Sequence, residues 1–265
     1  MTEQKELNKM IFVTGDCHGR FYKLSSKTFR EQKEMTKDDL VIICGDFGAV
    51  WDNPESEDDR YWLNWLNDKP FTTVFCDGNH ENFDMLNNNF KTVDFRGGKA
   101  HIIRDSVFHL MRGEIFDFEG LKFFVFGGAA SHDISGGILD RDDFKTAAEY
   151  KRTLRQWQKE RRLFRINHKT WWKEELPSDE EYANAEKNLA AVGYNVDYVI
   201  THCAPQSVVD SIYTYHKEEP NRLKLWFDAL KDKLDFEMWY FGHYHNDIFM
   251  DNGFTLLYDE IERIT

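Results

Sequence analysis

The sequence lacks the features that mark a disulfide scaffold, a structural zinc site or a membrane protein. Its 265 residues include only four cysteines, Cys17, Cys44, Cys76 and Cys203, and no two of them form a CxxC pair. We therefore expect reduced, buried thiols. No apolar run approaches the roughly 20 residues that cross a bilayer, and the N-terminal MTEQKELNKMIFVTGD does not match a signal peptide. These absences predict a cytoplasmic protein without a membrane partner.

The chain also has no excess of positive charge; its acidic residues outnumber its basic ones. The chain has 34 Lys and Arg residues against 47 Asp and Glu residues, a formal net charge of −13. This balance disfavours a protein that coats nucleic acid through bulk electrostatics, although a local basic patch is compatible with it. Five prolines and 41% hydrophobic residues are ordinary for a globular chain. We predict one domain spanning residues 1–265, and no feature indicates an oligomeric state.

Six apolar runs, each ended by glycine or a polar cluster, predict buried strands. Helix-like segments that open with acidic residues, an N-cap or a proline lie between several of them, so we expect an α/β protein with parallel strand pairs. Further strand-like pieces suggest antiparallel additions, in a mixed sheet or in two sheets. The runs cover 10–16, 40–46, 71–80, 122–128, 196–202 and 238–245; the helical segments are 58–67, 178–192 and 220–234; the further pieces are 99–105, 106–118 and 254–264.

Residues 131–178 differ from the rest of the chain, because they are long, basic in their middle and interrupted by a glycine pair. We interpret them as an elaboration between core strands that contains one basic helix. A positive patch there would attract a phosphorylated substrate, and a solvated helix face is the alternative. Trp171 and Trp172 follow closely behind Arg165 and His168, which suggests base stacking, although paired tryptophans also fill cores.

Polar side chains follow five of the six runs. The carboxyl ends of strands in open α/β sheets gather ligands, so we expect these groups to converge. Carboxylates, an amide and imidazoles suit Mn, Fe, Zn, Co or Ni better than a structural zinc–cysteine site. Eight groups exceed the needs of one ion and predict two metals that share a carboxylate, a clamp used for displacement at phosphorus. They are Asp16, His18, Asp46, Asn79, His80, His202, His243 and His245.

Strand alternation predicts that the outer residues of 16–18 and of 243–245 point to one side. Glycine precedes four of the eight groups and allows tight turns that aim them across the strand tips. His80 taken alone fits a metal ligand, a proton donor or a strand cap. Its neighbours Asp77 and Glu81 either orient the His80 ring or are solvated loop carboxylates.

The motifs GDCHG, GDFG, GNHE, THCAP and GHYH, in this order, closely resemble those of the calcineurin-like metallophosphoesterase superfamily, over residues 11 to about 258. The resemblance implies a four-layer α/β/β/α sandwich of two mixed sheets flanked by helices. It also implies site roles. Asp16, His18 and His245 would hold one metal, Asn79, His202 and His243 the other, Asp46 would bridge them, and His80 would be the proton donor.

The implied enzyme is a dinuclear phosphoesterase that hydrolyses phosphate mono- or diesters by direct attack of a metal-bridging hydroxide. Manganese is the first choice of metal, with Fe, Zn, Ni or Co as other choices, in divalent or mixed-valence pairs. The GDFG motif lacks the arginine of the GDxVDRG motif in protein Ser/Thr phosphatases, which disfavours that class. The alternative is a metal-dependent protein that binds phosphate or nucleotides without turnover.

Substrate contacts are expected from the elaboration. GGAASHDISGG places His132 and Asp133 directly after the fourth run, and we add Arg165 and His168 from the basic segment. The GGAxSxD and TWW stretches resemble a bacterial or phage subgroup of the superfamily. The expected partner is a phosphorylated small molecule or nucleotide, and a nucleic-acid end is a further candidate that the net charge does not indicate.

Overall fold

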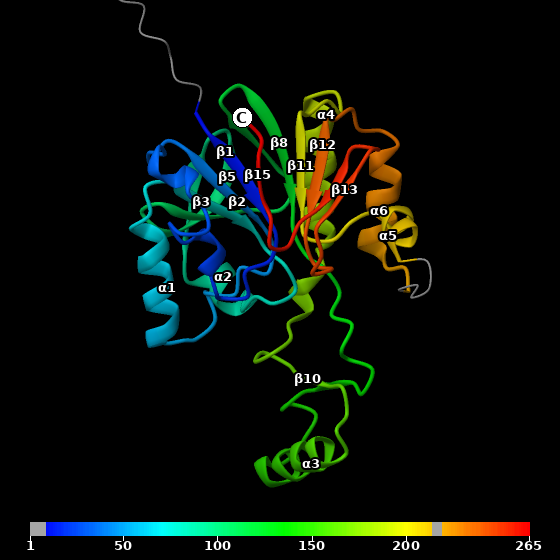
Figure 1. Cartoon of the computed structure of the whole chain (residues 1–265). Helices are drawn as coiled ribbons and strands as arrows, with labels where there is room; N and C mark the ends of the chain where they lie inside the picture. The colour runs from blue at the N-terminus through cyan, green and yellow to red at the C-terminus, as the bar shows by residue number, and fades with distance from the viewer. Residues whose placement is uncertain (1–8, 214–218) are drawn as a thin grey trace, which may run out of the picture.

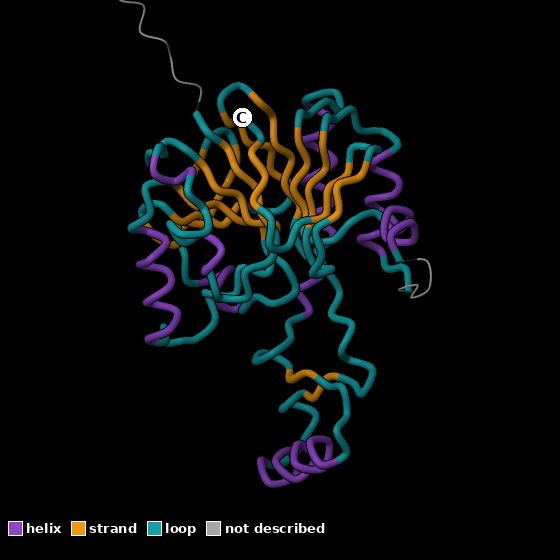
Figure 2. The backbone as a smooth tube through the Cα atoms, viewed as in Figure 1, coloured by secondary structure: helices purple, strands orange, loops and turns teal. Residues whose placement is uncertain are grey.

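Two mixed β-sheets form the centre of the molecule (Figure 1; Figure 2). The computed structural model describes residues 9–213 and 219–265; part of the N-terminal stretch on which the expected lack of a signal peptide rests lies outside them. One sheet has seven strands in the order β15-β1-β2-β3-β6-β5-β4, and the other has six in the order β13-β14-β12-β11-β8-β7.

The seven-stranded sheet has a parallel centre and antiparallel edges. Strands β1, β2, β3 and β6 pair in parallel, whereas β5, β4 and β15 are antiparallel to their neighbours. The strands are β1 (Ile11–Thr14), β2 (Leu40–Cys44), β3 (Thr72–Cys76), β4 (Lys91–Phe95), β5 (Gly98–Arg104), β6 (Val107–Leu110) and β15 (Ile261–Arg263).

The six-stranded sheet has the same plan, with β8, β11, β12 and β14 parallel and with β7 and β13 antiparallel. The antiparallel addition expected at 254–264 is confirmed for β15, which is antiparallel to β1, and β14 pairs antiparallel with β13 on one side and parallel with β12 on the other. The strands are β7 (Glu114–Phe118), β8 (Leu121–Phe126), β11 (Tyr198–Thr201), β12 (Met238–Phe241), β13 (Ile248–Met250) and β14 (Phe254–Leu256).

Three apolar clusters separate four layers. Alternation along each strand sends Ile11 and Val13 into the cluster between the two sheets, and sends Phe12 into the cluster beneath the outer helices. On the second sheet Val125 faces inward and Phe124 faces outward. Helices α1 (Glu57–Asn67) and α2 (Phe83–Asn88) cover the first sheet, and α4 (Asp179–Ala191), α5 (Gln206–Ile212) and α6 (Arg222–Lys231) cover the second. The predicted α/β/β/α sandwich is confirmed.

Local capping explains where the predicted helices begin. The Ser56 side chain accepts the Asp59 N–H at the start of α1. Ser178 and Glu181 form a reciprocal capping box at the start of α4. These side chains satisfy backbone donors that a helix start leaves without partners.

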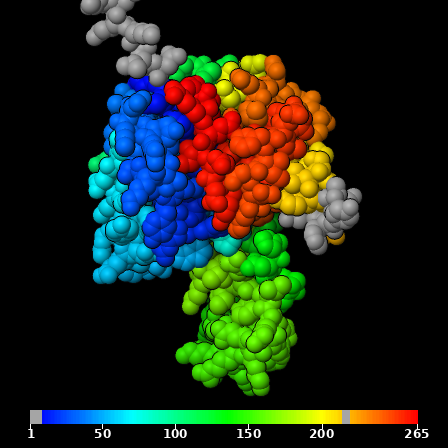
Figure 3. Space-filling model, viewed as in Figure 1, coloured from blue at the N-terminus to red at the C-terminus, as the bar shows by residue number. Residues whose placement is uncertain are grey.

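Residues 131–178 leave the body between β8 and α4 and form an arm (Figure 1; Figure 3). The arm contains the short parallel pair β9 (Ile138–Leu139) and β10 (Arg165–Ile166) and one basic helix, α3 (Ala147–Lys159), as predicted. Figure 3 shows the far end of the arm standing clear of the body.

No helix in the described ranges is both long and apolar enough to span a membrane. The four cysteines are free and buried, as expected. Burial raises the pKa of Cys17 to about 11, so its thiol stays protonated near neutral pH.

Candidate metal centre

The side chains predicted to bind metal gather at the carboxyl ends of five strands. Each lies in the loop that follows its strand, so the end of every strand delivers one or two polar groups to the same place. Asp16 and His18 follow β1, Asp46 follows β2, Asn79 and His80 follow β3, His202 follows β11, and His243 and His245 follow β12. The structure brings these residues together.

Asp16, His18 and His245 form the first group. Their ligand atoms all lie within 4.8 Å of one another. Nε2 of His18 is 2.9 Å from Nε2 of His245, and Oδ2 of Asp16 is 3.2 Å from that same His245 nitrogen. Oδ2 of Asp16 is buried and makes no hydrogen bond within the described part of the chain. A buried carboxylate oxygen of this kind calls for a positive charge close by.

Asp46, His202 and His243 form the second group, and Asn79 adjoins it. Nε2 of His202 lies 3.2 Å from Oδ1 of Asp46 and 3.3 Å from Oδ1 of Asn79. Nδ1 of His202 is 2.8 Å from the Cys44 carbonyl oxygen, which can only accept a hydrogen bond, so Nδ1 carries a proton. This hydrogen bond orients the ring with Nε2 toward the other polar groups.

Electrostatics in the second group favour a positive charge at its centre. Burial opposes a charged His202, but the carboxylates of Asp46 and Asp16 outweigh burial and raise the pKa of His202 to about 10. Burial and the neighbouring His202 lower the pKa of His243 to about 3, which leaves its imidazole neutral. Oxygen and imidazole nitrogen atoms without a thiolate fit a first-row divalent cation.

Asp46 lies between the two groups. Its Oδ1 contacts His202 of the second group, and its Oδ2 is 3.7 Å from Nδ1 of His18 in the first. Burial opposes ionisation, yet the adjacent imidazoles, His202 above all, hold the pKa of Asp46 well below its usual range. One ionised carboxylate therefore faces both groups.

The glycines before the site residues make room for close approach. A Cβ on Gly78 would lie 2.0 Å from Oδ1 of Asp46, and one on Gly242 would lie 2.2 Å from Oδ1 of Asp16. The predicted need for unusual turns applies to Gly45, whose φ is +86°. At Gly78 and Gly242 the reason for glycine is space beside a carboxylate.

The prediction that 16–18 and 243–245 lie on strands is wrong. Strands β1 and β12 end before these residues, which form loops. His18, His243 and His245 have φ values of 47°, 72° and 49°, in the left-handed region that L-residues seldom occupy. Loop backbone of this kind, and not strand alternation, aims the rings at the centre.

His80 lies beside the centre, half-buried. Its backbone N–H donates to Oδ1 of Asp46 at 2.7 Å, and its ring packs edge-on against His18 with 5.2 Å between centroids. Burial lowers the pKa of His80 against the attraction of Asp46, and the guanidinium of Arg165 lowers it further. Arg165 is thus an electrostatic neighbour of His80.

Glu81 was expected to orient the His80 ring or to be solvated, and it does neither. Its carboxylate is fully buried and accepts the N–H groups of Phe47 at 2.7 Å and Gly48 at 3.2 Å. Glu81 therefore clamps the GNHE loop to the GDFG loop that carries Asp46.

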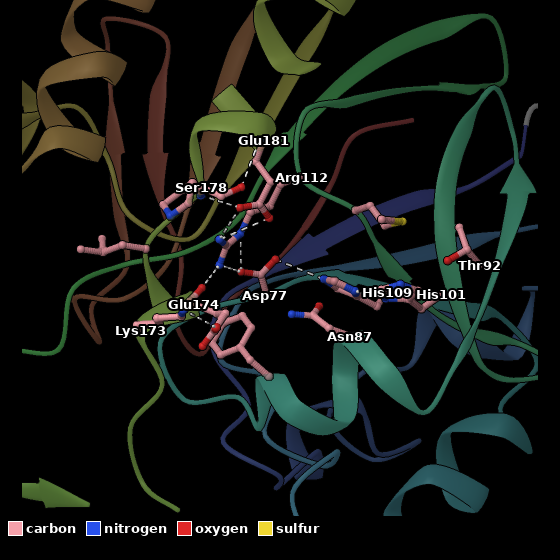
Figure 4. Close-up of a pocket in the computed structure, with 14 residues that line it drawn as sticks. Asp77, Asn87, Thr92, His101, His109, Arg112, Lys173, Glu174, Ser178 and Glu181 are labelled. Carbon is pink, nitrogen blue, oxygen red and sulfur yellow. Dashed lines mark hydrogen bonds and ion pairs between the residues drawn. The ribbon is translucent and has the colours of Figure 1, made fainter. Parts of the chain in front are cut away.

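Asp77 is buried as well, in a network beside a cavity of about 680 Å³ (Figure 4). It accepts hydrogen bonds from Nε of Arg112 at 2.8 Å and from Nη2, and it contacts Nε2 of His109 at 3.1 Å. Arg112 also donates to the Glu174 carbonyl at 2.8 Å. The buried arginine, which no sequence motif indicates, thus ties the GNHE loop to the end of the arm.

Ser131 and Glu175 lie at the two ends of the arm and form a chain of hydrogen bonds that ends on Asn79. The Ser131 N–H and hydroxyl donate to the Glu175 carboxylate at 2.9 and 2.7 Å. Because that hydroxyl proton is used, Oγ of Ser131 accepts from Nδ2 of Asn79, 3.4 Å away. The amide is thereby turned with Oδ1 toward His202. Sequence reasoning missed Glu175, which carries no motif.

Of the four predicted substrate contacts, His132 lies beside the centre, Asp133 and Arg165 pair with each other, and His168 lies elsewhere. The His132 ring centroid is 6.2 Å from that of His243. Asp133 forms an ion pair with Arg165, with 2.7 Å between Oδ2 and Nη2. His168 instead contacts Asp84 in α2, with 2.8 Å between Nδ1 and Oδ2.

Base stacking by Trp172 is contradicted. The side chain is 1% exposed, and its Nε1 donates to Asp84 at 2.8 Å. It packs edge-to-face on Trp51, with 5.6 Å between ring centroids, within the outer apolar cluster of the first sheet. Trp172 anchors the arm to the body, because a buried indole contributes large apolar contact area.

Comparison with known proteins agrees with this geometry. The model of the calcineurin-like phosphoesterase family matches residues 9–247. The chain belongs to this family. The predicted resemblance to the calcineurin-like metallophosphoesterases is thereby confirmed.

Two curated relatives are lariat debranching enzymes. The A form from Xenopus laevis is 26% identical over 148 residues, which are 51% of this chain and 26% of that protein. The Danio rerio enzyme is 26% identical over 144 residues, 49% of this chain and 24% of that protein. The chain thus spans about a quarter of the length of the curated relatives it matches.

Among solved structures, one match is the phosphopantetheinyl hydrolase of Mycobacterium tuberculosis. It is 13% identical, with a TM-score of 0.43 over 95% of this chain and 88% of that one.

Proposed function

We propose that this centre binds two metal ions, manganese being the first choice, and that the protein hydrolyses phosphate mono- or diesters. Asp16, His18 and His245 would hold one ion, and Asn79, His202 and His243 the other. The observation that carries the proposal is the position of Asp46, whose two oxygens face the two groups separately.

Two bound cations would supply Lewis acidity, which lowers the pKa of bound water and stabilises charge on the phosphoryl oxygens. The protein's own residues position the substrate and protonate its departing oxygen. Asp46 fixes the His80 backbone, and the His80 ring gives its proton to the departing oxygen. Arg165, oriented by Asp133, supplies the cation that the GDFG motif lacks.

The test is an assay of manganese-loaded protein on bis-p-nitrophenyl phosphate and p-nitrophenyl phosphate, with metal content measured in parallel. We expect turnover of at least one ester and two ions per chain. Full occupancy without turnover of either ester, or of a panel of nucleotides, would instead favour a phosphate-binding protein.

Ser131→Ala should weaken metal binding at the Asn79 side of the centre by about 10–100-fold, the usual effect of losing a group that orients a ligand. Without the hydroxyl, the Asn79 amide loses the acceptor for its Nδ2 group. Manganese titration monitored by activity should give a higher apparent Kd, while kcat at saturating metal stays within a few-fold.

Ser131→Thr is the matched control, because it keeps a hydroxyl and should restore the wild-type titration. A destabilised arm that affects metal binding only indirectly would instead leave both variants impaired alike.

A further inference from the structure

The arm carries a charge opposite to that of the rest of the chain. Between Lys145 and Lys173 there are ten Lys and Arg residues and two glutamates, a net charge of +8, which leaves −21 on the remainder. A polyanion would therefore be repelled by most of the molecule and attracted to this segment.

Among the described residues, the cations of α3 have no acidic partners. Lys151, Arg152, Arg155 and Lys159 are exposed, and within residues 9–213 and 219–265 none of them makes an ion pair or a side-chain hydrogen bond. The acids nearby are already engaged: Glu149 closes the capping box of α3, and Glu160 accepts from Gln156 and Arg162.

These cations form a stripe on one side of the helix. Lys151, Arg155 and Lys159 are spaced four residues apart, so they lie along one face over about 12 Å. The aromatic side of α3 is used inside the arm, where Tyr150 and Trp157 pack edge-on against the neighbouring phenylalanines, Phe144 and Phe164. Both aromatic side chains of α3 are therefore engaged within the arm.

The basic surface continues toward the metal centre. Arg165 lies in β10, between α3 and the body (Figure 1), and is paired with Asp133; the residue before Asp133, His132, has its ring centroid 6.2 Å from that of His243. The arm leaves the body on the side where the strand-end loops converge (Figure 1). A surface that only joined two copies of the chain would have no reason to lead into a phosphoester site.

We propose that the exposed face of α3 docks the phosphate backbone of a nucleic-acid strand, so that a phosphoester of the strand reaches the metal centre along the arm. This inference rests on the proposed function for the identity of the reacting group. The docking itself is a separate property, because single strands bind to exposed cations through phosphate neutralisation.

The test compares wild-type protein with the Lys151→Glu, Arg155→Glu and Lys159→Glu triple variant, both metal-loaded. Binding of a fluorescent 20-nucleotide single strand with phosphorothioate linkages, as DNA and as RNA, is measured by anisotropy over a range of salt. We expect the variant Kd to rise at least tenfold, and its log K against log salt slope to become shallower by about 2, or about 0.7 for each lost phosphate contact. Turnover of bis-p-nitrophenyl phosphate should stay within twofold of wild type.

A matched triple variant, Lys27→Glu, Lys33→Glu and Lys187→Glu, makes the same charge change at exposed sites outside the arm. Equal weakening by both triples would overturn the proposal, because binding would then follow net charge alone. An unchanged Kd in the α3 variant would also overturn the proposal. If sedimentation showed in addition that the wild type is a dimer and the variant a monomer, the basic face of α3 would be assigned to contact with a second copy of the chain. If wild-type protein did not turn over the small ester, the proposed function would be contradicted. The strand-binding measurement would still decide whether α3 docks nucleic acid.

Discussion

Replacing Asp46 by asparagine should remove both metal ions and lower turnover of p-nitrophenyl esters by about a thousandfold. Asp46 is the carboxylate that faces both groups, with contacts to His18 on one side and His202 on the other. A bound metal is worth several kcal/mol of transition-state stabilisation, and about 4 kcal/mol corresponds to three orders of magnitude. Metal content after gel filtration and kcat measured on the same sample check the prediction.

Asp39→Asn is the matched control, because Asp39 is also buried and lies at the opposite end of β2. Its carboxylate accepts the Met10 N–H at 2.7 Å and the Thr36 hydroxyl at 3.0 Å, so the variant should lose stability, by about 1–3 kcal/mol, and keep its metals. If the Asp46 variant kept both ions, Asp46 would not be their common ligand.

Replacing His80 by alanine should keep both metals and slow the reaction most for poor leaving groups. The ring lies beside the centre, while both groups of ligand atoms are complete without it. A general acid typically contributes about 10²–10⁴-fold, and its loss matters least where the departing oxygen is already stable as an anion. We expect that range of loss on alkyl esters and at most tenfold on p-nitrophenyl esters.

The leaving-group series is an internal control for this variant, since misfolding would slow every ester equally. His168→Ala removes an imidazole that contacts Asp84 instead of the centre, and it should leave the leaving-group dependence unchanged. Loss of metal from the His80 variant would make His80 a ligand and would contradict its role as proton donor.

The strand-end groups could be predicted because their pattern is local. An apolar run followed by glycine and a polar residue predicts a buried strand with a side chain at its tip, and parallel strands bring such tips to one edge. The geometry agrees: β1 and β2 run side by side, and Asp16 and Asp46 follow them. His80 remained ambiguous locally because its own neighbours do not define its surroundings.

The errors about the surroundings of single side chains share one physical origin. Asp77 and Glu81 look solvated next to a loop, but their partners come from distant positions, Arg112 and the backbone N–H groups of Phe47 and Gly48. The same holds for Trp172, which the fold places beside Trp51 in a core.

By itself the sequence pattern determined the α/β class, the convergence of polar groups at five strand ends and the basic character of the arm, whereas the four-layer arrangement was implied only by the family resemblance. Only the tertiary structure decided which carboxylates are buried, that left-handed loops aim the histidines, and that Glu175 orients Asn79 through Ser131. Periodicity and charge are properties of neighbouring residues, and the chain encodes them directly. The desolvation and partner of a polar group depend on how separate segments pack, and that packing exists only in the folded protein.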